Sequence, residues 1–359
     1  MNIFPGDLKK QAVRTGAKDF VDLPGSIPIV DVRTPSEFNK GHIPGAFNIA
    51  LFNDDERARV GTVYKQQDQL SAVMLGLDIA GPKMSGLLRQ GLKVAGKKSK
   101  LLLYCWRGGS RSESMAWLFA NGGIECIVLE GGYKAYRNYI LSELARPGKM
   151  IVLGGLTGSG KTAILSELSR MGEKVIDLEG LACHKGSAFG ALGQPDQPGS
   201  EHFENLLFDA MRKKDPGKRF FVEDESHNIG SVNIPHSFFE TMSKSKVIAL
   251  MPDIKTRLPR LRKEYGAYGT DQLIRSVEKI SRKLGGLNTS NAIEAIRSGK
   301  LDRAIEIVLK YYDRTYSYSL SQRPEGQVFY IESPSDDPYE NALKVKMMAD
   351  ELEDRATGV

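Results

Sequence analysis

The 359-residue sequence has few of the features that mark secreted and membrane proteins. Its three cysteines are too few, and odd in number, for a disulfide framework, and this usage is typical of a reducing cytoplasm. Its unbroken apolar stretches, such as 101–103 and 247–251, are far shorter than the ~20 residues that a membrane span needs. The opening residues MNIFPGDLKK lack the apolar segment of a secretory signal. We therefore expect a cytoplasmic chain without disulfide partners or membrane contact.

A large excess of charge of either sign is also missing. Lys and Arg number 50 against 44 Asp and Glu, which leaves a net charge of +6. Such a small excess indicates a polyanionic partner only where it is clustered. Apolar residues make up 41% and charged residues 26%, close to globular averages, which excludes a disordered or fibrous chain. The length predicts two or three domains.

The first part of the sequence predicts a parallel α/β domain. Short runs of branched and apolar residues predict buried strands at 27–33, 100–104 and 125–129. An amphipathic helix at 112–120 separates the last two strands, and this strand–helix–strand order indicates a parallel sheet. A further helix is expected at 136–145. The Arg-Pro-Gly run at 146–148 marks a linker, so the first domain is predicted to span residues 1–145.

The following residues predict a second α/β domain at 149–253. Its strands are expected at 149–153, 174–178, 219–222 and 246–251, and its helices at 162–171, 201–213 and 237–242. After residue 253 the sequence is basic and helical to about residue 320, and it ends in a strand at 327–331 and a helix at 338–352. We expect this mostly helical region, 254–359, to pack on or continue the second domain.

The first chemical motif is a cysteine loop between an expected strand and an expected helix. It reads Cys105-Trp106-Arg107-Gly108-Gly109-Ser110-Arg111-Ser112. Loop amides and a helix N-terminus attract anions and favour the thiolate form of a cysteine, and glycines allow the dihedral angles of a cradle. We therefore predict that Cys105 is a nucleophile and that Arg107 and Arg111 bind an oxyanion. A buried cysteine before an ordinary turn is the alternative.

Segments on either side of this loop resemble the rhodanese family. They are Asp31-Val32-Arg33, Gly41-His42-Ile43-Pro44-Gly45-Ala46 and Glu130-Gly131-Gly132-Tyr133, and the match covers about residues 10–140. The resemblance implies that the loop cysteine carries a transferable sulfur and that His42 is structural. Five residues separate Cys105 from Arg111, which is the spacing of phosphatase-type loops. We therefore expect the cradle to take a group larger than one sulfur atom, such as a phosphate-bearing donor.

The second chemical motif is a phosphate loop. The run Gly155-Leu156-Thr157-Gly158-Ser159-Gly160-Lys161-Thr162 fits G-x-x-x-x-G-K-[ST], follows an expected strand and opens an expected helix. The backbone amides are predicted to cradle a di- or triphosphate. Lys161 is predicted to reach the terminal phosphates, and the Thr162 hydroxyl to meet Mg²⁺.

Acidic residues follow the strand at 219–222, which is typical of a Walker B strand that helps to hold Mg²⁺. They are Glu223, Asp224 and Glu225. In an extended segment Glu223 and Glu225 share one side and Asp224 takes the other. Which side meets the metal stays open, and so does the alternative of a solvated acidic turn.

A long Gly-rich segment follows the strand at 174–178 and is expected to form a loop on the phosphate side of the sheet. Its candidate site residues are Asp177, Glu179, His184 and Lys185. A loose surface loop is the alternative. Cys183 and His184 lack the further ligands of a metal set, so we predict no metal ion other than Mg²⁺.

Basic residues cluster in the helical segment 255–283, where nine Lys and Arg face three acids. Such clustering is typical of a surface that binds an RNA backbone, with a solvated helix face as the alternative. Tyr265 and Tyr268 are candidates for stacking on unpaired bases. The predicted tRNA-binding residues are Arg257, Arg260, Arg262, Lys263, Arg275, Lys279, Arg282 and Lys283.

The two motif sets together resemble the bacterial tRNA 2-selenouridine synthase family over almost the full length. The match includes Gly61-Thr62-Val63-Tyr64, Leu75-Gly76 and Ile229-Gly230. The resemblance implies that 2-thiouridine at the wobble position of tRNA is alkylated by geranyl diphosphate and then receives selenium from selenophosphate. It implies tRNA and a selenophosphate synthetase as partners. Lys185 stands where the family pattern has Arg, and Asp68 where it has Gly.

By this resemblance the Cys105 loop takes the selenium donor and the P-loop takes the diphosphate. That reaction needs no net ATP, so we expect the P-loop ligand to be a diphosphate in preference to ATP or GTP. Three other functions stay open. They are a thiolate phosphatase or sulfurtransferase fused to a small-molecule or tRNA kinase, a non-catalytic tRNA-binding or nucleotide-switch protein, and a plain 2-thiouridine sulfurtransferase.

Overall fold

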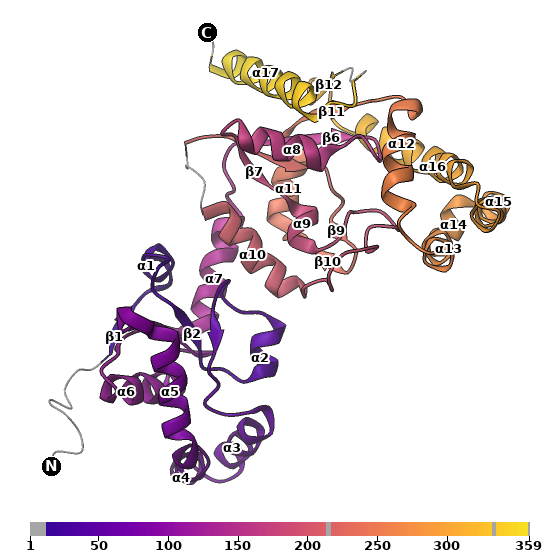
Figure 1. The fold of residues 1–359 in the computed structure, drawn as a ribbon. Coiled ribbons are helices and arrows are strands. Elements are labelled where there is room, and N and C mark those ends of the chain that lie inside the picture. The colour runs from indigo at the N-terminus through magenta and orange to yellow at the C-terminus, as the bar shows by residue number, and fades with distance from the viewer. Residues whose placement is uncertain (1–11, 213–216, 332–334, 358–359) are drawn as a thin grey trace. The chain divides into compact units, whose positions relative to one another are not determined.

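The computed structural model describes residues 12–212, 217–331 and 335–357. The chain forms two compact units, Met1–Glu143 and Leu144–Val359 (Figure 1). Each unit is built on a parallel five-stranded sheet, which confirms the predicted α/β class.

The sheet of the first unit has the strand order β1-β5-β4-β2-β3. The strands are β1 Val13–Thr15, β2 Ile29–Asp31, β3 Phe47–Asn48, β4 Lys100–Tyr104 and β5 Glu125–Leu129. β4 lies in the middle because nearly all its side chains are apolar; Leu101 and Leu103 are fully buried in one core. The predicted strands at 100–104 and 125–129 are confirmed, and the one at 27–33 is shorter.

Seven α-helices surround this sheet within the described residues. They are α1 Ala17–Asp22, α2 Pro35–Lys40, α3 Asp54–Gln66, α4 Gln69–Ala80, α5 Met84–Ala95, α6 Ser110–Asn121 and α7 Gly132–Leu144. The helices between residues 50 and 99 were not among the predicted elements, although residues typical of helix N-caps precede two of them. Asn53 and Glu56 form a capping box for α3, and Asp68 accepts the Ser71 N–H at the start of α4. Asp68 is thus the N-cap of α4.

A buried ion pair fixes the end of β2. The Arg33 and Asp31 side chains are 1% and 0% exposed, and Arg33 Nη2 lies 2.6 Å from Asp31 Oδ2. The guanidinium also donates to the Gly41 carbonyl at 2.7 Å and lies 3.9 Å from the centre of the Tyr133 ring in α7. The Asp-Val-Arg motif therefore ties the sheet to the start of α7.

The sheet of the second unit has the order β12-β11-β6-β8-β7. Its strands are β6 Met150–Gly155, β7 Lys174–Ile176, β8 Phe220–Glu223, β11 Lys246–Leu250 and β12 Val328–Ile331, beside a small antiparallel pair of β9 Asn228–Ile229 and β10 Val232–Asn233. The chain leaves β6 toward β8 and β7 and later returns to β6 on its other edge. The carboxyl end of β6 is therefore a topological switch point, where α/β sheets bind ligands.

Ten α-helices of the second unit lie within the described residues. They are α8 Lys161–Arg170, α9 Leu178–Ala182, α10 Ser200–Arg212, α11 His236–Lys244, α12 Ile254–Tyr265, α13 Thr270–Lys279, α14 Ser281–Leu284, α15 Gly286–Arg297, α16 Leu301–Ser321 and α17 Pro338–Thr357. α8 and α17 pack together on the sheet in one core. Among the described residues no helix combines the length and apolarity that crossing a membrane requires.

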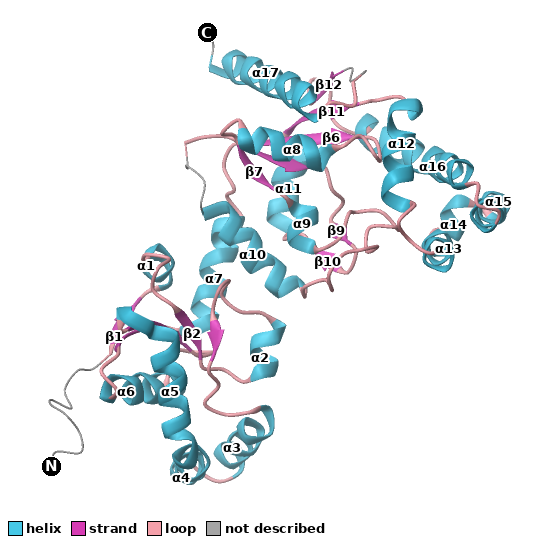
Figure 2. Cartoon of the chain, viewed as in Figure 1, coloured by secondary structure: helices cyan, strands magenta, loops and turns pink. Residues whose placement is uncertain are grey.

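The segment from α12 to α16 is a helical region with its own core (Figure 2). This core includes Val277, Ala292, Ile296 and Val308, and Phe189 joins it from the loop after α9. The chain then returns to the sheet, where β12 pairs with β11. The C-terminal residues 254–357 thus complete the sheet that carries the P-loop.

Replacing Asp31 by Asn leaves the buried Arg33 guanidinium without its counter-charge, which costs about 3–5 kcal/mol for a pair of this kind. Both tryptophans, Trp106 and Trp117, belong to the first unit, so denaturant unfolding followed by tryptophan fluorescence reports on this unit. We expect Asp31→Asn to lower its free energy of unfolding by about 3 kcal/mol, whereas Asp78→Asn on the exposed side of α4 changes it by less than about 0.5 kcal/mol. Equal effects of the two substitutions would contradict the anchoring role of the pair.

Candidate functional site

The Cys105 loop lies at the carboxyl end of β4, the middle strand of the first sheet. Cys105 is 3% exposed, and α6 begins at Ser110. The Ser112 hydroxyl, in the first turn of α6, donates to Cys105 Sγ at 3.3 Å. The same hydroxyl lies 3.0 Å from the Gly109 carbonyl, so its single proton has two acceptors, and Cys105 Sγ lies 3.9 Å from that carbonyl.

The carbonyl oxygens at the start of this loop are held from outside by α7. The Tyr133 N–H donates to the Cys105 carbonyl at 2.8 Å, and the Lys134 N–H donates to the Trp106 carbonyl at 3.0 Å. Gly132 has a φ of +61°, and a side chain there would collide with the Cys105 carbonyl. The N–H groups of Arg107 and Gly109 have no partner among the described residues. The loop therefore keeps free amide donors, as an anion cradle requires.

The two arginines of the loop differ in their surroundings. Arg107 is exposed, and no described residue forms an ion pair with it. Arg111 is half-buried, and its Nη1 lies 2.7 Å from Oε2 of Glu37 in α2. Burial alone raises the pKa of Glu37, but the bond and charge of Arg111 outweigh it and hold that pKa below its usual range. Glu37 thus fixes the guanidinium of Arg111 at the start of α6.

The P-loop follows β6 at the switch point of the second sheet. Gly158 and Gly160 have φ values of +80° and +83°, and side chains there would collide with Leu261 and Arg260 of α12. Lys161, the first residue of α8, donates from Nζ to the Gly155 carbonyl at 3.1 Å. This bond holds the ammonium group over the loop.

Two arginines of α12 hold the carbonyl side of the P-loop. Arg257 Nη1 donates to the Thr157 carbonyl at 3.1 Å, and Arg260 Nη1 donates to the Gly158 carbonyl at 2.8 Å. Arg257 is 3% exposed and is paired with Asp313 at 2.7 Å. The prediction that Arg257 binds tRNA is therefore corrected, because its buried side chain is committed to the loop, whereas Arg260 is 26% exposed and stays a candidate. The N–H groups of Gly158, Gly160 and Lys161 have no partner among the described residues.

Asp224 belongs to the framework beneath the P-loop. One of its oxygens accepts from the Tyr316 hydroxyl at 2.9 Å, and the other accepts from Arg323 at 2.7 Å. Tyr316 in turn accepts the Gly155 N–H at 2.7 Å. Tyr316, Arg323 and Asp313 could not be predicted as site residues, because they stand far along the chain in segments without a motif. Asp224 is accordingly engaged on both oxygens.

Glu223 and Glu225 face the other direction, toward Asp177 and Glu179 at the start of α9. Glu223 is fully buried, and its Oε2 accepts the Leu178 N–H at 2.8 Å. Burial and the charge of Asp177 raise its pKa well above the usual range. Burial and the charge of Glu179 raise the pKa of Glu225 to about 8, although Lys161 acts in the opposite direction.

This acidic edge fits Mg²⁺ that arrives with a phosphate ligand. Oε1 of Glu223 is buried without a hydrogen-bond partner, and the Thr162 hydroxyl lies 3.4 Å from Glu179. In the part of the chain that the structure describes, no group of three or more His, Cys, Asp or Glu is arranged to hold a metal ion. Mg²⁺ is usually bound by one or two carboxylates, with phosphates and water completing its shell.

The segment after α9 is an anchored loop beside these acids. His184 is 8% exposed, and burial together with the charge of Lys279 lowers its pKa. Lys185 forms an ion pair with Glu264 of α12. A side chain at Gly186, whose φ is +66°, would meet the Glu225 carboxylate. Lys185 therefore ties the loop to α12, Nδ1 of His184 is buried without a hydrogen-bond partner among the described residues, and the backbone of Gly186 closes one side of the acidic edge.

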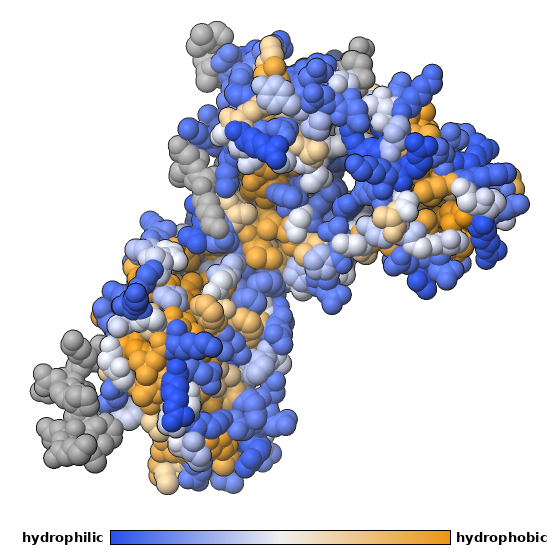
Figure 3. Space-filling view, in the orientation of Figure 1, coloured by the Kyte–Doolittle hydropathy of each residue, from blue (hydrophilic) through white to orange (hydrophobic). Residues whose placement is uncertain are grey.

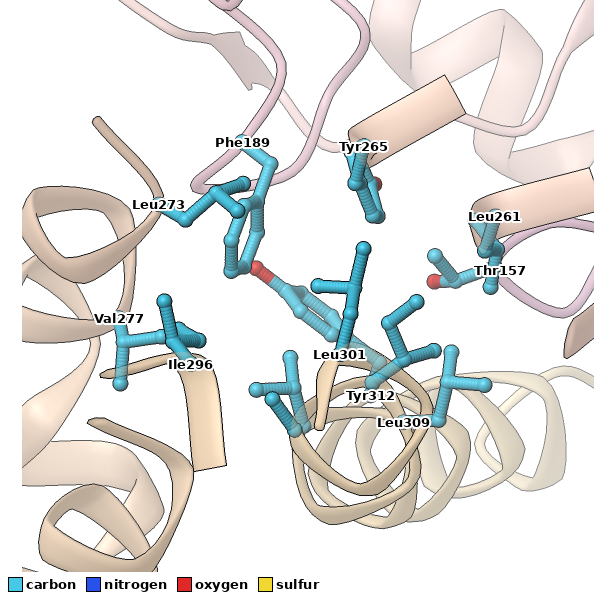
Figure 4. Close-up of a pocket in the computed structure, with 13 residues that line it drawn as sticks. Thr157, Phe189, Leu261, Tyr265, Leu273, Val277, Ile296, Leu301, Leu309 and Tyr312 are labelled. Atoms are coloured by element: carbon cyan, nitrogen blue, oxygen red, sulfur yellow. The ribbon is translucent and has the colours of Figure 1, made fainter. Parts of the chain in front are cut away.

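An apolar pocket, whose empty space of about 410 Å³ includes open solvent, lies beside the P-loop, and its enclosed part has room for about one water molecule (Figure 4). Thr157 and Leu261 lie at one end of it in Figure 4, and Val277 and Ile296 lie at the other. The lining is Thr157, Phe189, Leu261, Tyr265, Leu273, Val277, Ile296, Leu301, Ala304, Ile305, Val308, Leu309 and Tyr312. Its polar side-chain atoms are three hydroxyls, and that of Tyr312 already accepts the Ala188 N–H at 2.9 Å.

The two tyrosines expected to stack on bases belong to the interior of the helical region. The Tyr265 ring lines the cavity and lies 5.1 Å from the Phe189 ring, centre to centre. The Tyr268 hydroxyl donates to the Leu192 carbonyl at 3.1 Å. Both rings therefore contact the loop after α9 and are partly buried, and their stacking on bases stays a prediction.

Six of the eight predicted tRNA-binding residues are exposed on the helical region. They are Arg262, Lys263, Arg275, Lys279, Arg282 and Lys283. Arg262 forms an ion pair with Asp302 at 3.2 Å. In the space-filling view, hydrophilic residues cover much of the α12–α16 surface (Figure 3). This surface retains the positive charge that binding to a phosphate backbone needs.

The raised pKa of Glu225 predicts a pH dependence of stability. The neutral carboxyl group is favoured in the fold, so its contribution is full below about pH 4.3 and is lost as the pH rises through about 8. One proton corresponds to about 1.4 kcal/mol per pH unit within that window. We expect Glu225→Gln to reduce the slope of the second unit's free energy of unfolding against pH by about 1.4 kcal/mol per pH unit, which corresponds to one proton. The exposed Glu325→Gln should leave that slope unchanged. Calorimetry at several pH values measures the slope for both variants, and tryptophan fluorescence identifies which transition belongs to the first unit. An unchanged slope in Glu225→Gln contradicts the prediction.

Comparison with known proteins matches both units. A family model described as the tRNA 2-selenouridine synthase AAA domain covers residues 148–336, and a model of the rhodanese-like domain covers residues 15–139. The expected rhodanese resemblance of the first unit is confirmed.

Curated relatives extend across both units. The tRNA 2-selenouridine synthase of Bordetella petrii is 36% identical over 342 residues, which cover 84% of this chain and 89% of that protein. Those of Shewanella denitrificans and Nitrosomonas europaea are 34% and 33% identical over 84% of this chain and 90% and 91% of their own lengths. The chain therefore belongs to the tRNA 2-selenouridine synthase family.

Proposed function

We propose that this enzyme converts 2-thiouridine at the wobble position of tRNA to 2-selenouridine in two steps. The P-loop unit alkylates the sulfur with geranyl diphosphate, and the rhodanese-like unit supplies selenium from selenophosphate at Cys105. The observation that carries the first step is the apolar cavity beside Thr157 of the P-loop. An anion cradle next to an apolar cavity is complementary to a diphosphate that bears a hydrocarbon chain.

The cavity favours an isoprenoid diphosphate over a nucleotide as the P-loop ligand. A purine base needs hydrogen-bond donors and acceptors, but the lining offers only three hydroxyls and otherwise hydrocarbon. Burial of a hydrocarbon chain contributes about 0.8 kcal/mol per methylene group. A chain of the length of geranyl would gain several kcal/mol from this lining once the side chains move apart to admit it, whereas a base would gain little.

In the alkylation step, the sulfur of 2-thiouridine attacks C1 of the geranyl group. The carbon–oxygen bond breaks, pyrophosphate leaves, and the N3 proton of the base is released. Lys161 and the free amides of Gly158 and Gly160 stabilise the charge that develops on the leaving group. Mg²⁺, held by Glu223 or Glu225 with Thr162, supplies further neutralisation of that charge when bound.

The exposed basic residues of the helical region support tRNA as the macromolecular substrate. Lys279, Arg282 and Lys283 lie close together along α13 and α14 and are solvent-accessible. Phosphate contacts from such residues bind RNA without regard to sequence. Recognition of the wobble base then falls to the residues around the two anion loops.

If the two loops perform separate steps, substitutions in them should have opposite effects on the amount of geranylated base. With a 2-thiouridine stem-loop, geranyl diphosphate and selenophosphate, Lys161→Ala should lower formation of the geranylated base at least about 100-fold, because it loses a preorganised cation at the leaving group. Cys105→Ala should form the geranylated base and accumulate it. Base masses from digested RNA measure both.

Lys149→Ala, an exposed lysine before β6, and Cys183→Ala are the matched controls and should form 2-selenouridine at the wild-type rate. Loss of geranylation in Cys105→Ala would refute the assignment of the two steps to separate loops.

A further inference from the structure

The oxidation state of selenium limits what Cys105 can do. Selenium is equally reduced in selenophosphate and in 2-selenouridine, so its transfer requires no electrons. A perselenide on Cys105 contains a sulfur–selenium bond, and making that bond from a thiolate and a selenide removes two electrons. No oxidant takes part in the proposed function, on which this inference rests.

The Cys105 loop instead fits a reaction in which the cysteine attacks the phosphorus atom of the donor. Five residues separate Cys105 from Arg111, which gives a cradle of successive backbone amides. Amides of this cradle, such as those of Arg107 and Gly109, have no partner among the described residues, and their carbonyl neighbours are held by α7. A phosphoryl group carries three oxygens that accept hydrogen bonds, so it matches several converging amides better than a single selenium atom does.

The side chains around the sulfur fit the same chemistry. Arg111 donates to Glu37 from Nη1 at 2.7 Å and from Nη2 at 3.4 Å, which keeps its charge at the start of α6 and leaves its remaining N–H groups for phosphoryl oxygens. The Ser112 hydroxyl lies 3.3 Å from Cys105 Sγ and 3.0 Å from the Gly109 carbonyl, so a turn of its proton toward the sulfur supplies a donor to the departing thiolate. Glu37 does not reach the substrate, and it acts as a positioning residue for Arg111.

We propose that Cys105 attacks the phosphorus atom of selenophosphate and releases hydroselenide. A sulfur–phosphorus bond forms, the phosphorus–selenium bond breaks with its electron pair leaving on selenium, and the thiol proton of Cys105 passes to the departing selenium. The products are S-phosphocysteine and the hydroselenide anion.

The released hydroselenide completes the conversion without an oxidant. It attacks C2 of the S-geranylated base, the carbon–sulfur bond breaks, and geranylthiolate leaves while N3 of the base takes the proton from selenium. Water then attacks the phosphocysteine, which yields inorganic phosphate and regenerates the Cys105 thiol. Ser112 donates to the departing sulfur in this last step.

The test follows the two atoms of the donor separately. The full-length enzyme is mixed with an S-geranyl-2-thiouridine stem-loop and with selenophosphate that carries radioactive phosphorus or, in a parallel reaction, radioactive selenium. The reaction is quenched within one turnover, and the Cys105 peptide is isolated. We expect phosphorus, and no selenium, on this peptide.

The Ser112→Ala variant should make the phosphocysteine easier to trap, because it removes the hydroxyl that donates to the Cys105 sulfur when water cleaves the sulfur–phosphorus bond. We expect it to lower the hydrolysis rate of the phosphocysteine about 10- to 100-fold and to increase the trapped label, whereas Cys183→Ala behaves as the wild type. Selenium on the Cys105 peptide overturns the proposal. Selenation of the base with neither label on the peptide, in the wild type and in Ser112→Ala, overturns it too. A stem-loop that receives no selenium from the wild type refutes the proposed function itself.

Discussion

Both candidate sites depend on one constraint, which is that the carbonyl oxygens of an anion-binding loop must be held from outside. In the first unit the amides at the start of α7 hold the carbonyls of Cys105 and Trp106. In the second unit Arg257 and Arg260 hold those of Thr157 and Gly158. Because each peptide group carries a donor and an acceptor, fixing the acceptors on one side leaves the amides available on the other.

The two loops then differ in the groups placed beside the free amides. Next to the first lie a buried thiol, a hydroxyl that donates to it and an arginine fixed by Glu37. Next to the second lie an ammonium group, carboxylates whose pKa values burial raises, and an apolar cavity. The first set suits nucleophilic attack on a phosphoryl group, and the second suits departure of a diphosphate from a hydrocarbon chain.

The sequence predicted the loops well, because their chemistry is local. Each motif combines a strand, glycines, a charged residue and the start of a helix within about ten residues. The place of each loop in the fold therefore follows from the order of these elements. The supporting residues were not predictable in this way. Tyr316 and Arg323 reach Asp224 from more than 90 residues away, and the acids beside Arg257 and Lys185 are equally hidden in helices without a motif. The same limit applies to the basic residues of α12, because composition does not tell which face of this helix contacts the P-loop.

The most direct measurement of the central claim is a calorimetric titration of the full-length enzyme with geranyl diphosphate, inorganic pyrophosphate and ATP in the presence of Mg²⁺. If the P-loop and the apolar cavity form one site, geranyl diphosphate binds at least about 100-fold more tightly than pyrophosphate and with a negative heat-capacity change, because its chain leaves water. Equal affinity for geranyl diphosphate and pyrophosphate, or tighter binding of ATP than of either, would contradict the account.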